Sequence, residues 1–126
     1  MFRFEKLEIW KKSIEITDDI FNLADQLDER RKYRFTEQIR SAALSISNNI
    51  AEGSGSLSRP EFRQFINYSH RSVSETANML IICQRREYIT EEAKIQFLDR
   101  LEEISRMLTG FSRSLSFPRS PLTAQR

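Results

Sequence analysis

Two of the three glycines in this chain lie in the stretch NNIAEGSGSLSRPEF, residues 48–62, between segments with helical periodicity. A Gly-x-Gly loop that leads into a helix can hold a phosphate on its backbone N–H groups. This loop lacks the Gly-Lys-Ser/Thr ending of a phosphate-binding loop, and it follows a helix rather than a strand. We therefore expect a turn, with Gly53 just past a helix C-terminus at positive φ and Gly55 in the turn that follows. An anion held at the start of the next helix, beside Arg59, is the alternative.

Other residues that could do chemistry are few. His70 is the only histidine, which leaves little basis for a catalytic triad or a metal site, and we expect a solvated side chain. Cys83 has no CxxC partner, and its position predicts a buried thiol on the inward face of a helix. Glu91 and Glu92 are best explained as acidic residues in a first helical turn. The sequence contains no Glu-x-x-His pair, so a di-iron bundle is disfavoured. We expect no enzymatic activity, no metal and no cofactor.

Composition favours one helical domain. The chain has 126 residues, 30% of them charged, with three glycines and three prolines, which is typical of long helices and few turns. A single cysteine excludes an internal disulfide, and the charged N-terminus is not a signal peptide. No apolar run approaches the length of a membrane span, so we expect a soluble, cytoplasmic protein.

Hydrophobic periodicity predicts four helices, at about residues 5–29, 34–52, 58–87 and 91–115. Ser58, with Glu61 three residues later, predicts a capping box, and Thr90 is expected to cap the fourth helix. Connections of a few residues favour an all-α, up-down-up-down antiparallel four-helix bundle in residues 1–115. Residues 116–126, with two prolines and two arginines, are expected to form a flexible basic tail.

The first helix has two apolar stripes, and one bundle needs only one of them. The first stripe has the spacing of a core face and comprises Leu7, Trp10, Ile14, Phe21 and Ala24. The second stripe comprises Ile9, Ile16, Ile20, Leu23 and Leu27, and the far side of the third helix adds Tyr68, Met79 and Ile82. We interpret these extra residues as an interface between subunits, because the second stripe has near-heptad spacing. Scattered apolar residues on the surface are the alternative.

Charge is unevenly distributed, although the net charge is only +2. Residues 1–29 carry four basic and eight acidic side chains, a balance of −4, and residues 30–40 carry five and one, a balance of +4. In the expected topology the first and third connections lie at one end of the bundle. That end, the basic pole, comprises Arg30, Arg31, Lys32, Tyr33, Arg34, Arg85, Arg86 and Tyr88. Such a patch can neutralise phosphates and stack on unpaired bases, or it can simply be a solvated end whose charges complement helix C-termini.

A longer motif surrounds the opening stretch. Residues 38–53, QIRSAALSISNNIAEG, resemble the hallmark of the 23S rRNA intervening-sequence protein family, also called the four helix bundle protein family. The resemblance extends from residue 4 to about residue 115. It includes the flanking patterns Phe4-x-x-Leu7-x-x-Trp10, Ser58-x-x-Glu61-Phe62 and Ser72-x-x-Glu75.

The resemblance implies a four-helix bundle that assembles into a ring, commonly a pentamer, with no established enzymatic activity. A related bundle, the accessory variability protein of diversity-generating retroelements, forms a basic pentameric barrel that works with a reverse transcriptase and RNA. This chain departs from the family pattern at Ser56, where arginine is usual, and at Arg71, where glycine is usual. The first departure weakens a phosphate-binding role for the loop, and the second adds a charge to a face expected between subunits.

The motif residues Arg40, Asn49, Glu52, Gly53, Ser58 and Glu75 are expected to have structural roles. We expect Arg40 to pair with Glu75 across the second and third helices, and Asn49 to bond a neighbouring helix or the loop. The functional hypothesis is a homo-oligomeric bundle that binds RNA or a ribonucleoprotein through the basic pole. The alternative is a protein-interaction adaptor, such as an accessory subunit of a retroelement reverse transcriptase.

Overall fold

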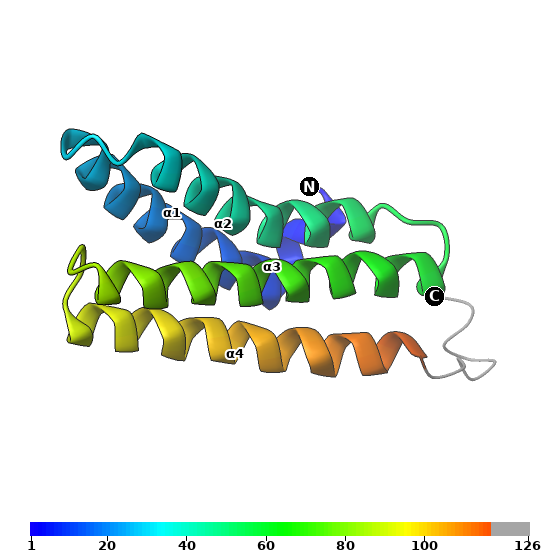
Figure 1. Cartoon of the computed structure of the whole chain (residues 1–126). Helices are drawn as coiled ribbons and strands as arrows, with labels where there is room; N and C mark the ends of the chain where they lie inside the picture. The colour runs from blue at the N-terminus through cyan, green and yellow to red at the C-terminus, as the bar shows by residue number, and fades with distance from the viewer. Residues whose placement is uncertain (117–126) are drawn as a thin grey trace.

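A computed structural model describes residues 1–116 and confirms an all-α four-helix bundle (Figure 1). The elements are a short 3-10 turn and four helices: η1 (Arg3–Lys6), α1 (Glu8–Glu29), α2 (Tyr33–Ser54), α3 (Arg59–Arg85) and α4 (Glu91–Ser116). Consecutive helices are antiparallel, as the up-down-up-down topology requires. The expected tail, except Ser116, lies outside the described residues.

The core forms mainly between α2 and α3, between α3 and α4, and between α1 and α2. Contacts between α1 and α4 are fewer, and ion pairs from Lys12 to Glu103 (2.8 Å) and from Arg100 to Asp19 (2.7 Å) bridge these two helices. Within residues 1–116, no helix combines the length and the apolar character needed to cross a membrane.

The first helix buries the opposite stripe from the one expected. Five side chains assigned to a subunit interface are at most 8% exposed within the single chain: Ile9, Ile16, Ile20, Leu23 and Leu27. Met79 of the third helix, at 6%, is also buried. Of the stripe expected to form the core, only Ala24 is fully buried, whereas Leu7, Trp10, Ile14 and Phe21 are half-buried. The interface assignment was therefore wrong for these six residues, which fill the core.

Two hydroxyl residues are buried together with this stripe. Ser13 and Thr17 lie on the buried stripe, and each donates a hydrogen bond of 2.6 Å to a carbonyl one turn earlier in α1, at Ile9 and Ser13. Because these bonds satisfy the hydroxyls inside the helix, the stripe can be buried although its sequence is partly polar. The chain also bends before this helix, since Leu7 is extended (φ −83°, ψ 126°) and separates η1 from α1.

Close packing of α2 on α3 sets the role of the loop glycines. Gly53 lies inside α2, not beyond its end, and Gly55 caps the helix at φ −85°. No glycine among the described residues has a positive φ, so the expected left-handed turn at Gly53 was wrong. A Cβ on Gly53 would lie 2.7 Å from the Cβ of Phe65, which means that the residue must be glycine for the helices to approach. The Glu52 carbonyl accepts the Gly55 N–H at 3.1 Å and closes the turn.

Candidate nucleic-acid interface

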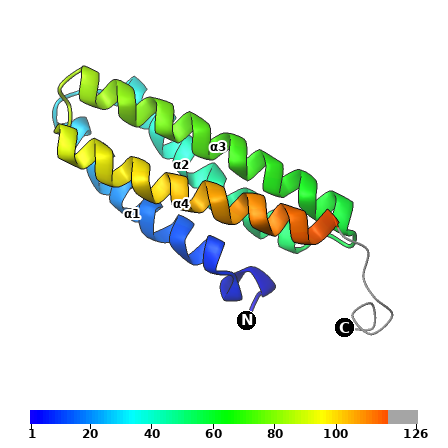
Figure 2. The same cartoon turned by 90° about the horizontal axis from the view of Figure 1, so that it is seen from below.

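The two basic connections lie at the same end of the bundle, side by side in both views (Figures 1 and 2). Both use one backbone geometry. The N–H of Lys32 bonds the carbonyl of Leu27 at 3.1 Å, and the N–H of Tyr88 bonds the carbonyl of Cys83 at 2.8 Å. Each is the 6→1 bond of a Schellman motif, which satisfies orphan carbonyls at a helix C-terminus.

The residues that precede Lys32 and Tyr88 have a left-handed backbone conformation. Arg31 has φ 60° and Glu87 has φ 61°, in positions where glycine is usual. An L-residue in this conformation costs about 1–2 kcal/mol. Residues with strained backbone conformations concentrate at functional sites, which makes this pole a candidate site.

Tyr88 joins the two connections. The Cζ of Arg30 lies 5.2 Å from the centre of the Tyr88 ring, and the Nζ of Lys32 lies 5.4 Å from it. Phe35 of α2 packs edge-on against the same ring at 5.9 Å. Cation–π attraction and aromatic packing thus fix the first connection against the third. Residues some fifty positions apart form one surface.

Most of the remaining pole is open to solvent. The exposed side chains are Arg30, Arg31, Tyr33, Arg34, Arg85 and Arg86, whereas Lys32 and Tyr88 are half-buried. Tyr33 is 59% exposed, so its ring is the one available for stacking, since the ring of Tyr88 already contacts two cations. Among residues 1–116, none of the six pole cations forms an ion pair.

Arg40 braces α2 against α1 next to this pole. Its Nη2 lies 2.6 Å from the Oδ1 of Asp25 and 2.6 Å from the Oδ2 of Asp28. The expected pair with Glu75 was therefore wrong, because the acidic residues of α1 are the nearer partners. The hydrogen bond from Arg40, with a second from the Thr36 hydroxyl, lowers the pKa of the Asp28 carboxyl. The two aspartates in turn raise the pKa of Arg40.

Glu75 and Asn49 line an exposed polar groove of about 460 Å³ between α2 and α3, together with Tyr68, Arg71 and Ser72. Asn49 donates to the Ser45 carbonyl of its own helix at 2.8 Å, which corrects the expected bond to a neighbouring helix or the loop. These two motif residues thus meet on a surface rather than in the core.

Helix caps lie where the sequence predicts them. Ser58 Oγ accepts the N–H of Glu61 at 3.2 Å, and Thr90 Oγ1 accepts the N–H of Ala93 at 3.1 Å. Only the Ser58 half of the expected capping box is present, because the Glu61 side chain makes no return bond among the described residues.

His70 and Cys83 have different environments. Cys83 is fully buried, as expected, and burial raises the pKa of its thiol to about 12. His70 is half-buried rather than solvated, and its Nε2 lies 2.8 Å from Ser105 Oγ of α4. Ser105 and Thr109, one turn apart on α4, were the sequence signal for a polar partner of His70. No cluster of metal-binding side chains occurs in the described part of the chain.

Known proteins share this architecture. The sequence model of the 23S rRNA-intervening sequence protein family matches residues 5–110. A crystal structure of a protein of unknown function from the S23 ribosomal protein family of Bacteroides thetaiotaomicron is 28% identical, with a TM-score of 0.78, over 82% of this chain and 97% of that chain. No curated protein matches the sequence. The chain belongs to the 23S rRNA-intervening sequence protein family.

Proposed function

We propose that this protein binds RNA or a ribonucleoprotein through the basic pole, in the cytoplasm and without a chemical step. The observation that carries the proposal is the joining of two distant basic connections around Tyr88. The family description, which names the 23S rRNA intervening sequence, supports RNA as the partner.

The pole has the components that unpaired RNA requires. Six cations without an ion pair in residues 1–116 can contact successive phosphates, and the exposed Tyr33 ring can stack on a base. Each phosphate neutralised on a single strand adds about −0.7 to the slope of log K against log salt concentration. Six contacts would give a slope of about −4. Acidic neighbours in sequence, Glu29 and Glu87, limit the long-range field, so binding depends on local contacts.

A charge-matched pair of variants tests the proposal. The pole variant replaces Arg31, Arg85 and Arg86 by glutamine, and these three side chains are exposed and have no ion pair within residues 1–116. The control variant replaces Lys6, Lys11 and Arg106 by glutamine, which removes the same charge elsewhere. Fluorescence anisotropy with a single-stranded RNA, measured across a salt series, gives the slope for each protein.

We expect the pole variant to lose about two units of slope and the control variant to retain the wild-type slope. Equal losses in both variants would indicate non-specific attraction and contradict the assignment to the pole. Wild-type protein that binds no RNA at low salt would contradict the function itself, and a protein partner would then be the explanation to pursue.

We also propose that the protein assembles into a ring-like homo-oligomer, a pentamer being expected from the family resemblance. After the correction to α1, two residues of the predicted interface remain accessible: Tyr68 at 37% and Ile82 at 39%. Both lie on α3. Tyr68 lines the groove that contains Asn49 and Glu75, and the helical repeat places Ile82 on the same face of α3. Repeating the basic pole around a ring would make weak RNA contacts avid.

Light scattering on the full chain tests the assembly. The variant Tyr68→Glu with Ile82→Glu places charge on the proposed interface and should give monomers. Ile95→Glu with Leu57→Glu is the control, because these side chains are 47% and 102% exposed and lie outside that face. A wild-type monomer at micromolar concentration would contradict the ring.

A further inference from the structure

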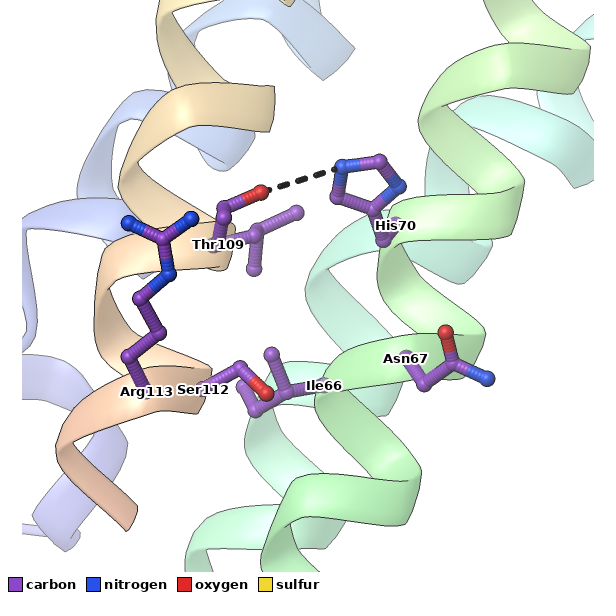
Figure 3. A pocket seen from close by; sticks show the side chains of 7 residues that line it. Ile66, Asn67, His70, Thr109, Ser112 and Arg113 are labelled. Carbon is purple, nitrogen blue, oxygen red and sulfur yellow. Dashed lines mark hydrogen bonds between the residues drawn. The ribbon is translucent and has the colours of Figure 1, made fainter. Parts of the chain in front are cut away.

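A second polar groove lies between α3 and α4, toward the end of the bundle opposite the basic pole. Two adjoining hollows of about 250 and 420 Å³ share Asn67 and Ser112. Arg63 and Gln64 line one hollow, and Arg113, Thr109 and His70 line the other. In Figure 3, Thr109, Ser112 and Arg113 project from α4, and His70, Ile66 and Asn67 belong to the facing α3.

This part of the helical hairpin is strongly basic. Residues 105–116 of α4 contain two arginines and no acidic residue, and residues 59–71 of α3 contain three arginines and one glutamate. The balance is five basic against one acidic side chain, or +4 with His70 neutral. Neither Arg63 nor Arg113 forms an ion pair within residues 1–116. Both guanidinium groups are therefore available to an anion.

Polar contacts between α3 and α4 hold the groove at both of its ends. Arg59 donates a hydrogen bond from Nη2 to the carbonyl of Ser114, which ties the start of α3 to the end of α4. About three helical turns away, His70 Nε2 meets Ser105 Oγ at 2.8 Å. Because these contacts exist without a ligand, binding would require little rearrangement of the backbone.

We propose that this groove binds a phosphate group. Arg63 and Arg113 supply planar guanidinium groups that suit phosphate oxygens. The Ser112 hydroxyl and the Asn67 amide supply neutral donors, and Ile66 and Leu108 form an apolar wall beside Arg113. Free phosphate and the backbone of a nucleic acid present the same chemistry. The site is separate from the basic pole, and its existence does not depend on RNA binding there.

His70 provides a direct measurement because it is the only histidine in the chain. Its Hε1 and Hδ2 signals can be assigned in a proton NMR spectrum without isotope labelling. The full-length protein is titrated at constant pH and ionic strength, first with inorganic phosphate exchanged for chloride and then with a short single-stranded RNA. The variants are Arg63→Gln with Arg113→Gln and, as the control, Arg71→Gln, which lies next to His70 but lines the groove between α2 and α3.

We expect phosphate to shift the His70 signals saturably in wild-type protein and in the Arg71→Gln variant. The double variant should bind at least about tenfold more weakly, because two charge-assisted hydrogen-bonding groups are lost. If RNA produces the same shifts at much lower concentration, the phosphate belongs to a nucleic-acid backbone; if only inorganic phosphate does, the ligand is a free phosphate. Shifts that grow linearly without saturation with both probes, or an unchanged affinity in the double variant, would overturn the proposal. The basic-pole variant should leave these shifts intact, so failure here is distinguishable from failure of RNA binding at the pole.

Discussion

Gly53 in α2 lies so close to α3 that a Cβ at this position would be 2.7 Å from Phe65 Cβ and 2.8 Å from Phe62 Cδ1. The first contact is the more restrictive, because the Cβ of Phe65 is attached directly to the α3 backbone. The sequence motif that ends in Gly53 therefore marks the closest approach of two helices. Glycine is therefore required at residue 53 by the packing of the two helices, and not by the backbone conformation of a turn.

Gly53→Ala should destabilise the protein by about 1–3 kcal/mol, since the added methyl group overpacks a tight helix crossing. Gly110→Ala is the matched control, because Gly110 is in α4 and a Cβ added there would meet no atom within 4 Å. That change should stabilise by about 0.5–1 kcal/mol through helix propensity. Urea unfolding followed by circular dichroism measures both. The same sign for the two variants would contradict the packing explanation.

The N-caps of the helices were the part of the local structure that the sequence predicted well. The caps at Ser58 and Thr90 depend on a side-chain oxygen and the N–H groups of the next turn, so both could be predicted from a few residues. The meeting of the two basic connections followed from helix order alone, because alternate connections of an antiparallel bundle share an end. Tyr88 as their common contact required the folded structure.

The sequence could not predict which face of a helix is buried or which of several possible partners a side chain contacts. The stripe of Ile16 and Ile20 was assigned to a subunit interface because one bundle needs only one apolar face of the helix and this stripe has near-heptad spacing. The folded structure shows that α1 turns this stripe into the core, with the Ser13 and Thr17 hydroxyls bonded within the helix. The partner of Arg40 was wrong for a similar reason. Several carboxylates are compatible with its position on α2, and tertiary packing selects Asp25 and Asp28.

Cys83 should react with a thiol reagent at least about a thousandfold more slowly in the folded protein than in urea, because the reactive species is the thiolate. Its side chain is 0% exposed, and burial raises its pKa to about 12. The release of the chromophore from Ellman's reagent, followed with and without denaturant, measures the ratio. Rapid reaction under native conditions would show that α3 is not packed as described.

Asp28 should make stability depend on pH in the acid range. The hydrogen bond from Arg40 lowers the pKa of Asp28 in the folded state, so its stabilisation is complete above the unfolded value of about 3.9 and is lost as pH falls through the lower folded value. Asp28→Asn should therefore cost stability at neutral pH, and its deficit relative to wild type should shrink below about pH 4.

The matched control for Asp28 is Asp99→Asn, since Asp99 is exposed and forms no ion pair within residues 1–116. Urea unfolding at neutral and acidic pH gives both differences. A deficit of Asp28→Asn that stayed constant with pH would mean that its ion pair contributes nothing to stability.

Arg31 and Glu87 allow stability and binding to be separated at the basic pole. Both residues are left-handed, at φ 60° and φ 61°, so replacing either by glycine should stabilise the fold by about 0.5–1 kcal/mol after the entropy lost by glycine is subtracted. Their charges are opposite. Arg31→Gly should weaken RNA binding and reduce the magnitude of the salt slope by about 0.7, whereas Glu87→Gly should strengthen binding by removing a negative charge next to the cations. Thermal unfolding and RNA anisotropy on the two variants test both effects. If RNA affinity changed in the same direction for both variants, backbone strain rather than charge would govern RNA binding at the pole.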